Sequence, residues 1–296
     1  MSTSSSDAPG DNRPYDLATP AGTARALREF GLRPRKRWGQ HFLISRRALN
    51  AILAAAGVEP DDTVLEIGAG LGTLTVELAR RAAAVAAVEI DAAMLPALRA
   101  AVQAHRNVVL IHGDVMRLDL GVLLAGVSKI VANLPYGVAS PLIVRLLERP
   151  AGVRAMVLTV QREVADRLTA RPGGKDYGAL SVAVQYRADV ATAGRIPATA
   201  FYPPPDVESA VVRLEVLASP RVAPADAAAF FRVVRSAFGQ RRKMLRNTLA
   251  SGLGITTAQA ERACAAAGLD PRRRGETLSV EEFAALTAAV LELPER

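Results

Sequence analysis

The stretch that decides the fold is VLEIGAGLGTLT, residues 64–75. A short strand-like run leads directly into three alternating glycines, Gly68, Gly70 and Gly72, and then into a segment that reads as a helix. Glycines at a strand-to-helix turn let the backbone approach a ligand closely and expose amide groups at the start of the helix. Glu66 lies beside the turn and is expected to help orient it. Dinucleotide enzymes have similar turns, so the stretch predicts a nucleotide-like ligand without naming it.

Strand and helix signals alternate outward from this turn. Further strands are expected at residues 84–91, 107–114, 129–136 and 154–161, with helices at 73–81 and 92–102 between them. Apolar strands interleaved with helices indicate an α/β fold with a parallel sheet that is covered on both faces.

The pattern changes after residue 161. Residues 181–196 and 208–217 are interpreted as two more strands, separated by FYPPPDV (201–207), which cannot form a regular helix. Residues 225–250, 257–268 and 279–293 are interpreted as helices. We therefore predict a flexible tail at 1–21, a ligand-binding α/β domain at 22–219 and a small helical domain at 220–296.

Composition and net charge limit the kinds of partner, site and location that the protein can have. The 296 residues carry a net charge of +8, which points to a polyanionic partner, although the cations are nearly all arginine in an alanine-rich chain and the total is weak evidence by itself. Cys264 is the single cysteine, so no intrachain disulfide can form, and the three histidines lack metal-ligand spacing. Neither a membrane span nor a signal peptide is visible. We expect a cytoplasmic protein without a metal.

Acidic residues follow two of the predicted strands. Glu89 ends the second strand, where its carboxylate can accept hydrogen bonds from two ribose hydroxyls, as in NAD enzymes. Asp114 follows the third strand, where it can accept from an adenine amino group. A glycine-rich turn, an acid and an acid at successive strand ends is the layout of S-adenosylmethionine (SAM) methyltransferases. The alternative is that both acids are solvated loop residues.

After the fourth strand comes NLPYG, residues 133–137. Asn, Pro and Gly are common in turns, so the simplest interpretation is a turn. The position, at the strand edge where α/β sheets bind ligands, also suits a site. The Asn133 side-chain carbonyl and a backbone carbonyl freed at Leu134-Pro135 could accept hydrogen bonds from an aromatic amine, and Tyr136 could stack on its ring. Such a site would act by positioning and electrostatics, on a base turned out of its helix or held in a loop.

Ten short sequence motifs, or blocks, which occur in the same order as in a known family, show a resemblance to that family. The chain closely resembles the KsgA-type ribosomal RNA adenine dimethyltransferases from about residue 35 to residue 282. The blocks are GQHFL, VLEIGAGLGTLT, VEID, GDV, NLPYG, QREVADRL, YGALSV, FYPPPDVESAVVRL, FGQRRKMLRNTL and RRRGETLSV. The resemblance implies a Rossmann-like fold, with a mostly parallel seven-stranded sheet whose last strand is antiparallel, plus a small all-helical C-terminal domain.

The resemblance also implies an activity: a monomeric enzyme transfers four methyl groups from SAM to N6 of two adjacent adenosines. These lie in the 3′-terminal hairpin loop of 16S rRNA, within the small ribosomal subunit or its late precursor. Loss of such enzymes is associated with kasugamycin resistance. By resemblance, His41 and Leu43 line the SAM site with Gly68, Gly70, Glu89, Asp114 and Asn133. Many members carry Asn at the position of His41, and histidine can still donate a hydrogen bond. Phe201 resembles the aromatic residue that packs on the target base; its alternative is a core position.

Two basic clusters are the candidates for RNA contact. Arg35, Lys36 and Arg37 precede the first block, and Arg241, Arg242, Lys243 and Arg246 lie in what reads as a C-terminal helix. Contacts from these residues would go to phosphates and would not depend on sequence. The alternative for the second cluster is an ordinary solvated helix face.

Three other functions are weighed. A SAM-dependent methyltransferase acting on DNA adenine or a glutamine side chain would use a similar Asn-Pro-Pro-Tyr turn, but the basic C-terminal helices disfavour it. An RNA-binding assembly factor is disfavoured by the intact Asn133, Glu89 and Asp114. An NAD-dependent oxidoreductase is disfavoured because no acid, base or metal for hydride transfer accompanies the glycine turn.

Overall fold

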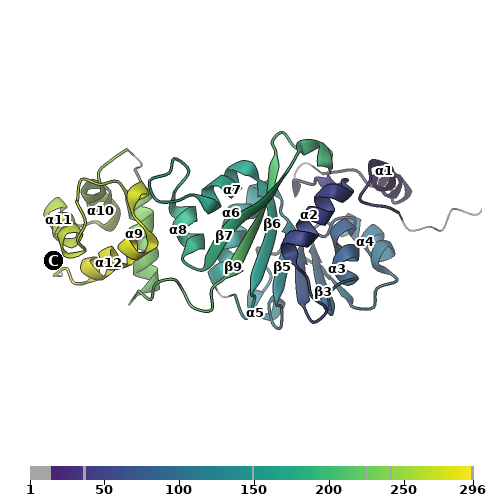
Figure 1. Cartoon of the computed structure of the whole chain (residues 1–296), viewed down its shortest axis with the longest axis horizontal. Coiled ribbons are helices and arrows are strands. Elements are labelled where there is room, and N and C mark those ends of the chain that lie inside the picture. Colours follow the sequence, from purple (N-terminus) through teal and green to yellow (C-terminus); the bar gives the residue numbers. More distant parts are fainter. Residues whose placement is uncertain (1–14, 36–37, 149, 225, 241, 295–296) are drawn as a thin grey trace, which may run out of the picture.

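A computed structural model describes residues 15–35, 38–148, 150–224, 226–240 and 242–294. Its centre is a seven-stranded sheet in the order β4-β3-β2-β5-β6-β9-β7, flanked by helices (Figure 1). The strands are β2 (Thr63–Ile67), β3 (Ala84–Glu89), β4 (Val108–His112), β5 (Lys129–Asn133), β6 (Ala155–Gln161), β7 (Ala188–Ile196) and β9 (Ser209–Val216). The first five strands in this order, from β4 to β6, pair with one another in parallel. β9 runs antiparallel to both β6 and β7. The predicted sheet, with its antiparallel last strand, is confirmed.

Helices cover both faces of the sheet. Successive residues of its central strands point to opposite faces, so these apolar strands need cover on both sides. In β5, Ile130 and Ala132 join one core cluster with the helices α6 and α7, whereas Val131 joins a second cluster with α2 and α3. The helices of this part are α1 (Pro20–Glu29), α2 (Arg46–Ala56), α3 (Thr73–Ala79), α4 (Leu95–Val102), α5 (Leu120–Leu123), α6 (Ala139–Glu148), α7 (Arg162–Thr169) and α8 (Ala179–Gln185).

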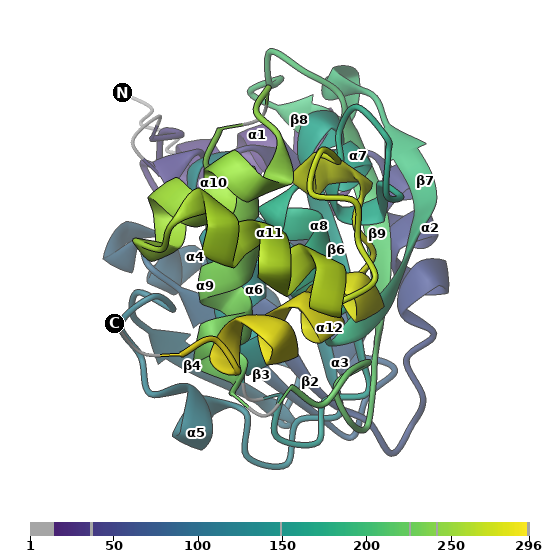
Figure 2. The same cartoon turned by 90° about the vertical axis from the view of Figure 1, so that its left-hand side faces the viewer.

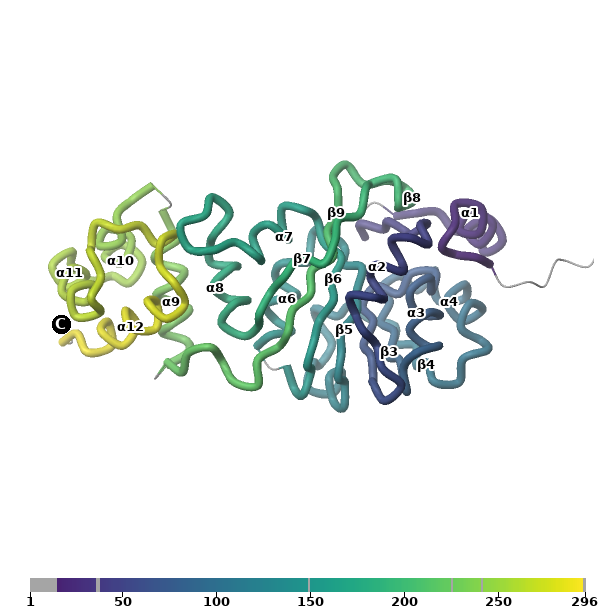
Figure 3. Tube along the Cα trace, in the orientation of Figure 1, coloured from purple at the N-terminus to yellow at the C-terminus, as the bar shows by residue number. Residues whose placement is uncertain are grey.

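A second, two-stranded sheet brings distant segments together. β1 (Phe42–Leu43) pairs antiparallel with β8 (Phe201–Tyr202), and the tube in Figure 3 shows β8 returning toward the N-terminal part of the chain. This pairing places the residues just before β1 above the carboxyl edge of the main sheet.

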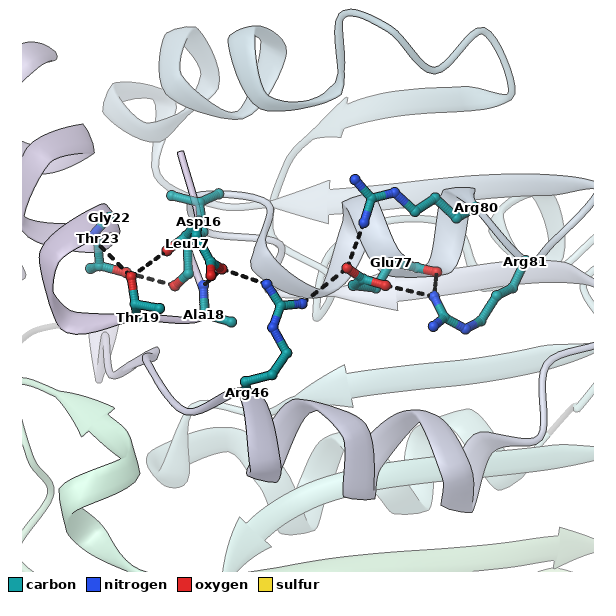
Figure 4. Close-up of polar contacts among 10 residues, drawn as sticks. All are labelled: Asp16, Leu17, Ala18, Thr19, Gly22, Thr23, Arg46, Glu77, Arg80 and Arg81. Atoms are coloured by element: carbon teal, nitrogen blue, oxygen red, sulfur yellow. Dashed lines mark hydrogen bonds and ion pairs between the residues drawn. The ribbon is translucent and has the colours of Figure 1, made fainter. Parts of the chain in front are cut away.

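The N-terminal segment is attached to the main domain through Arg46. The Arg46 guanidinium forms ion pairs with Asp16, before α1, and with Glu77 of α3 at 3.1 Å. Glu77 also accepts from Arg80 and Arg81, each at 2.7 Å (Figure 4). Burial raises the pKa of Glu77, but the arginines around it outweigh that effect and lower the pKa below its usual value. The Arg46 guanidinium of α2 therefore joins the segment before α1, through Asp16, to α3, through Glu77.

The C-terminal helices form a separate layer at one end of the molecule (Figure 2). They are α9 (Ala227–Phe238), α10 (Leu245–Leu253), α11 (Thr257–Ala266) and α12 (Val280–Leu291). Their core also includes Tyr177, Val182 and Tyr186, from α8 and its flanks. The C-terminal helices therefore pack directly on the α/β part.

Two sequence predictions about secondary structure are wrong. The strand expected at residues 181–196 begins only at Ala188, and the residues before it form α8. In α8, Leu180 and Val184 face the core of the sheet, whereas Val182 and Tyr186 face the C-terminal core. A helix that is buried on two sides shows apolar residues at every second position, and this pattern imitates a strand.

The helix expected across residues 225–250 is the other error. α9 ends at Phe238 and α10 begins at Leu245, with Gly239 at the C-cap of α9. Arg242 and Lys243 therefore lie in the connector, where both are exposed, and not on a helix face.

Candidate functional site

A cavity lies at the carboxyl edge of the sheet, where β2, β3 and β5 end. Residues 38–43 form one wall, and the turns after the three strands form the others. Nine of the residues predicted for the site line it together: His41, Leu43, Gly68, Gly70, Glu89, Asn133, Leu134, Pro135 and Tyr136. Trp38, Gly39 and Gln40 line it as well.

The glycine turn has the backbone geometry that its sequence predicts. Gly68 and Gly70 have φ of 79° and 57°, in the left-handed region that glycine adopts without strain. The Gly68 amide donates to the Val88 carbonyl at 2.9 Å, which ties the turn to β3. A Cβ atom at Gly70 would lie 3.3 Å from the Phe42 ring, so β1 sits tightly against the turn. The turn is thus held between β3 and β1.

Glu89 is buried at the end of β3, with 4% of its surface exposed. Its Oε2 accepts from the Gly70 amide at 2.7 Å, and its Oε1 accepts from the Asp91 amide at 2.8 Å. Burial raises the pKa of Glu89, and these backbone amides oppose the rise. Each carboxylate oxygen has two lone pairs, so both can still accept from a ligand hydroxyl.

A second carboxyl group, that of Glu66, lies under the turn. It is 2% exposed, and its Oε2 has no hydrogen-bond partner among the described residues. Burial, followed by repulsion from Glu89, raises the pKa of Glu66 to about 8. Glu66 is therefore largely neutral at pH 7, which limits the negative charge of the cavity to Glu89.

The NLPYG turn presents its polar atoms to the same cavity. Asn133 ends β5, and its Nδ2 donates to the His41 carbonyl at 3.1 Å. This contact fixes the amide plane and leaves Oδ1 as an acceptor. The Leu134 amide donates to the Thr159 carbonyl at 3.1 Å, while no residue that the structure describes donates to the Leu134 carbonyl. Two consecutive residues of the turn, Asn133 and Leu134, therefore each have a carbonyl oxygen that can accept a hydrogen bond.

The aromatic side chain of Tyr136 is fixed on two sides. Its ring stacks on the His41 ring, with centroids 5.4 Å apart and planes at 23°. Its hydroxyl bonds to the Ser209 hydroxyl at 2.8 Å, and burial raises the pKa of Tyr136. His41 Nδ1 bonds in turn to the Pro203 carbonyl at 2.7 Å, so the histidine connects the turn to the loop after β8. Because a carbonyl can only accept, Nδ1 carries the proton and is not free to donate to a ligand.

Two predicted residues do not line the cavity. Asp114 follows β4, where one carboxylate oxygen accepts from the Met116 amide at 2.9 Å and the other lies 3.5 Å from Arg117. Phe201 is 2% exposed and belongs to the core cluster behind β1. This burial favours the core position that the sequence left as the alternative for Phe201.

The predicted RNA contacts divide into three groups. Lys36, Arg37 and Arg241 lie outside the described residues. Arg35 and Arg246 are engaged within the protein, because Arg35 pairs with Asp91 at 3.1 Å and Arg246 pairs with Glu261 at 2.6 Å. Arg242 and Lys243 are exposed in the connector after α9.

Sequence reasoning missed residues that support the site from behind. Gln40 donates to Asp91 at 3.1 Å and accepts from the Arg35 amide at 2.8 Å, which closes the loop before β1 over β3. Ser209 reaches Tyr136 only because β9 runs antiparallel beside β6. Asp91 could have been found, since it stands two residues after Glu89; nothing local marks Ser209.

The described part of the chain lacks two further features. It contains no group of three or more His, Cys, Asp or Glu side chains that could hold a metal ion. None of its helices is both long enough and apolar enough to cross a bilayer.

Comparison with known proteins agrees with this arrangement. A model of the family described as Ribosomal RNA adenine dimethylase matches residues 31–289. The chain is 46% identical over 287 residues to Ribosomal RNA small subunit methyltransferase A of Geobacillus thermodenitrificans, covering 94% of this chain and 98% of that protein. The protein of the same name from Moorella thermoacetica is 47% identical over 281 residues, covering 92% and 97%.

Solved structures resemble most of the chain. A dimethyladenosine transferase from Plasmodium falciparum matches with a TM-score of 0.69 at 25% identity, covering 82% of this chain and 94% of that one. The 23S rRNA methyltransferase ErmE matches with a TM-score of 0.64 at 25% identity, covering 84% and 99%. Given the family match over most of its length and relatives of this identity, the chain belongs to the ribosomal RNA adenine dimethylase family.

Proposed function

We propose that this chain uses SAM to dimethylate N6 of adenosines in 16S rRNA. The observation that supports the proposal is the turn after β5, where Asn133 and Leu134 line the same cavity as Glu89 and the glycine turn. The finer proposal is four methyl transfers to two adjacent adenosines in the 3′-terminal hairpin loop. The enzyme would act as a monomer in the cytoplasm, on the small subunit or its late precursor.

The residues of the cavity suit SAM. The buried Glu89 carboxylate offers two acceptors for a ribose diol, and the left-handed Gly68 and Gly70 shape the turn that lines the cavity beside it. SAM supplies, when bound, a methyl group on a positively charged sulfur, and a cavity with one buried carboxylate suits that charge. Asp114 is proposed to accept from the adenine amino group after its side chain turns from Met116.

The chemistry proposed for the turn is orientation of the target amine. The lone pair of adenine N6 is delocalised into the ring, so the amine is a poor nucleophile. Acceptors at Asn133 Oδ1 and the Leu134 carbonyl would hold both N–H groups and turn the lone pair toward the methyl donor. Tyr136, held by Ser209 and His41, is proposed to offer the free face of its ring to the base.

Residues 220–296 are proposed to contact rRNA, with Arg242 and Lys243 as exposed candidates. Lys36, Arg37 and Arg241 remain candidates from the sequence. Arg35 and Arg246 would have to leave their acidic partners, which makes them weaker candidates than their sequence positions suggest.

The direct test is methyl transfer from labelled SAM to small subunits that lack the modification, with the modified nucleosides identified by mass. We expect N6,N6-dimethyladenosine in the rRNA and no labelling of duplex DNA. Labelling of DNA alone would instead identify a DNA methyltransferase, and binding to subunits without any methyl transfer would identify an assembly factor.

Glu89→Ala is expected to weaken SAM binding roughly 10- to 100-fold, because a hydrogen bond to a charged group contributes about 1.5–3 kcal/mol. Isothermal titration calorimetry would measure the change, with Glu163→Ala, at an exposed position of α7, as the matched control that leaves affinity unchanged. In parallel, SAM at about 100 times its Kd should stabilise the unsubstituted chain by about 2.7 kcal/mol, and NAD should not. An unchanged SAM affinity in Glu89→Ala would remove Glu89 from the site.

A further inference from the structure

A second polar hollow lies between α9 and α10, away from the cavity described above. Its volume is about 410 Å³. We call it the α9–α10 hollow, lined by Arg232, Arg235, Ser236, Gly239, Gln240, Thr248, Ser251 and Gly252. None of these lining residues is acidic, and none has a large apolar side chain. Figure 2 shows α9 and α10 next to each other in the C-terminal layer.

The floor of the hollow is set by a close helix contact. A Cβ atom at Gly252 would lie 2.5 Å from the Ser236 Oγ, so α10 approaches α9 as closely as only glycine permits. Ser236 and Thr248 use their hydroxyl protons on carbonyls of their own helices, at 2.8 and 2.9 Å. The donors left to face a ligand are the two guanidinium groups, with the Gln240 amide and the Ser251 hydroxyl.

The two arginines stand one helical turn apart, so their side chains share one face of α9. Both are exposed, and no described residue forms an ion pair or a hydrogen bond with either guanidinium group. Other arginines of the C-terminal layer are paired: Arg246 with Glu261, Arg272 with Asp270, Arg273 with Glu282 and Arg274 with Glu276. Within the described part of the chain, the fold therefore neutralises much of its C-terminal positive charge but pairs no acid with Arg232 or Arg235.

We propose that the α9–α10 hollow binds a backbone phosphate of the rRNA substrate, held by Arg232 and Arg235. The proposal rests on the proposed function and adds a docking point outside the predicted clusters. A phosphate suits the hollow because guanidinium groups bind its oxygens in a bidentate way. A protein partner is disfavoured, since the hollow lacks the apolar and aromatic side chains found at the core of protein interfaces.

The hollow also continues into exposed positive charge. Gly239 and Gln240 line it and begin the connector that carries Arg242 and Lys243. A phosphate bound in the hollow would contact residues that precede these two cations by only a few positions in the sequence. Consecutive phosphates of one strand could then contact the hollow and the connector in turn.

The test compares binding of the full chain to undermethylated small subunits over a series of salt concentrations. The double variant Arg232→Gln/Arg235→Gln should bind roughly tenfold more weakly, and the slope of log K against log salt should fall by about one. The variant Arg232→Lys/Arg235→Lys should keep the slope but recover only part of the affinity, because lysine is a point charge. The rate at saturating subunit and the affinity for SAM should not change.

Arg262→Gln is the matched control, because Arg262 is an exposed arginine of the same layer, on α11, outside the hollow. A double variant that binds with unchanged affinity and slope, or a control that loses as much, would overturn the proposal. A loss seen on subunits but not on protein-free 16S rRNA would point to a ribosomal protein and would also overturn it. If the unsubstituted chain neither bound nor methylated subunits, the proposed function itself would fail instead.

Discussion

Asn133→Ala is expected to lower the rate of methyl transfer roughly 100- to 1,000-fold, as removal of a positioned polar group from an active site typically does. The side chain is proposed to supply one of the two acceptors that orient the target amine. Its Oδ1 is held in place by the hydrogen bond from Nδ2 to the His41 carbonyl. The measurement is single-turnover methyl transfer to undermethylated small subunits at saturating SAM. Subunit binding, measured separately, should stay within about twofold of the unsubstituted chain, because phosphate contacts dominate such affinities.

The matched control is Asn107→Ala, far along the chain from the turn. Asn107 also uses its amide on backbone carbonyls, those of Ala79 and Ala82 at 2.9 and 3.0 Å, at the end of α3. This substitution should cost stability and leave the methyl-transfer rate of the folded protein unchanged. If Asn133→Ala abolished subunit binding along with methyl transfer, Asn133 would be structural and the roles assigned to the turn would need revision.

Asp62→Ala is expected to destabilise the folded state by about 3–5 kcal/mol, the usual result of removing one partner from a buried ion pair. Asp62 is fully buried and lies 2.8 Å from Lys129 Nζ, which is itself buried at the start of β5. It also accepts from the Ser128 hydroxyl at 2.6 Å and from Arg154 at 2.8 Å. The carboxylate thus joins the starts of three strands, and its loss leaves a buried ammonium group without a counter-charge. Urea unfolding would measure the change.

The Asp62 carboxylate also makes the stability of the folded state depend on pH in the acid range. Burial raises the pKa of Asp62, but hydrogen bonds from Lys129 and Ser128 outweigh it and hold the pKa well below its usual value. Its stabilisation is therefore complete above the unfolded pKa of about 3.9 and is lost as the pH falls below that value. Asp62→Ala should flatten this part of the stability profile. Asp119→Ala, which removes an exposed helix cap, should cost only about 1 kcal/mol; equal losses in the two variants would contradict the role given to Asp62.

Local sequence was sufficient to predict the parts of the cavity that lie at the ends of β2, β3 and β5. The glycine turn after β2, Glu89 at the end of β3 and Asn133 at the end of β5 all lie at one edge, since parallel strands end on the same side of a sheet. Their order along the chain therefore predicted their meeting in space. The left-handed glycines and the rigid X-Pro step of NLPYG are properties of the residues themselves.

Prediction of secondary structure from the local sequence failed where tertiary packing decides the conformation of a segment. The alternation in residues 180–186 reads as a strand, and only the packing of α8 between two cores makes it a helix. The run FGQRRKMLRNTL reads as one helix, whereas the fold ends α9 at Phe238 and turns into α10.

The sequence by itself determined the layered α/β plan, the family resemblance and the cavity at the strand edge, because these depend on the order of residues along single elements. Only the tertiary structure decided which arginines form ion pairs with acidic side chains. Arg35 and Arg246 meet acids that are distant in the sequence, while Arg232 and Arg235 pair with no acid among the described residues. Pairing between side chains is a property of the distances between elements, and a linear pattern of charges does not contain those distances.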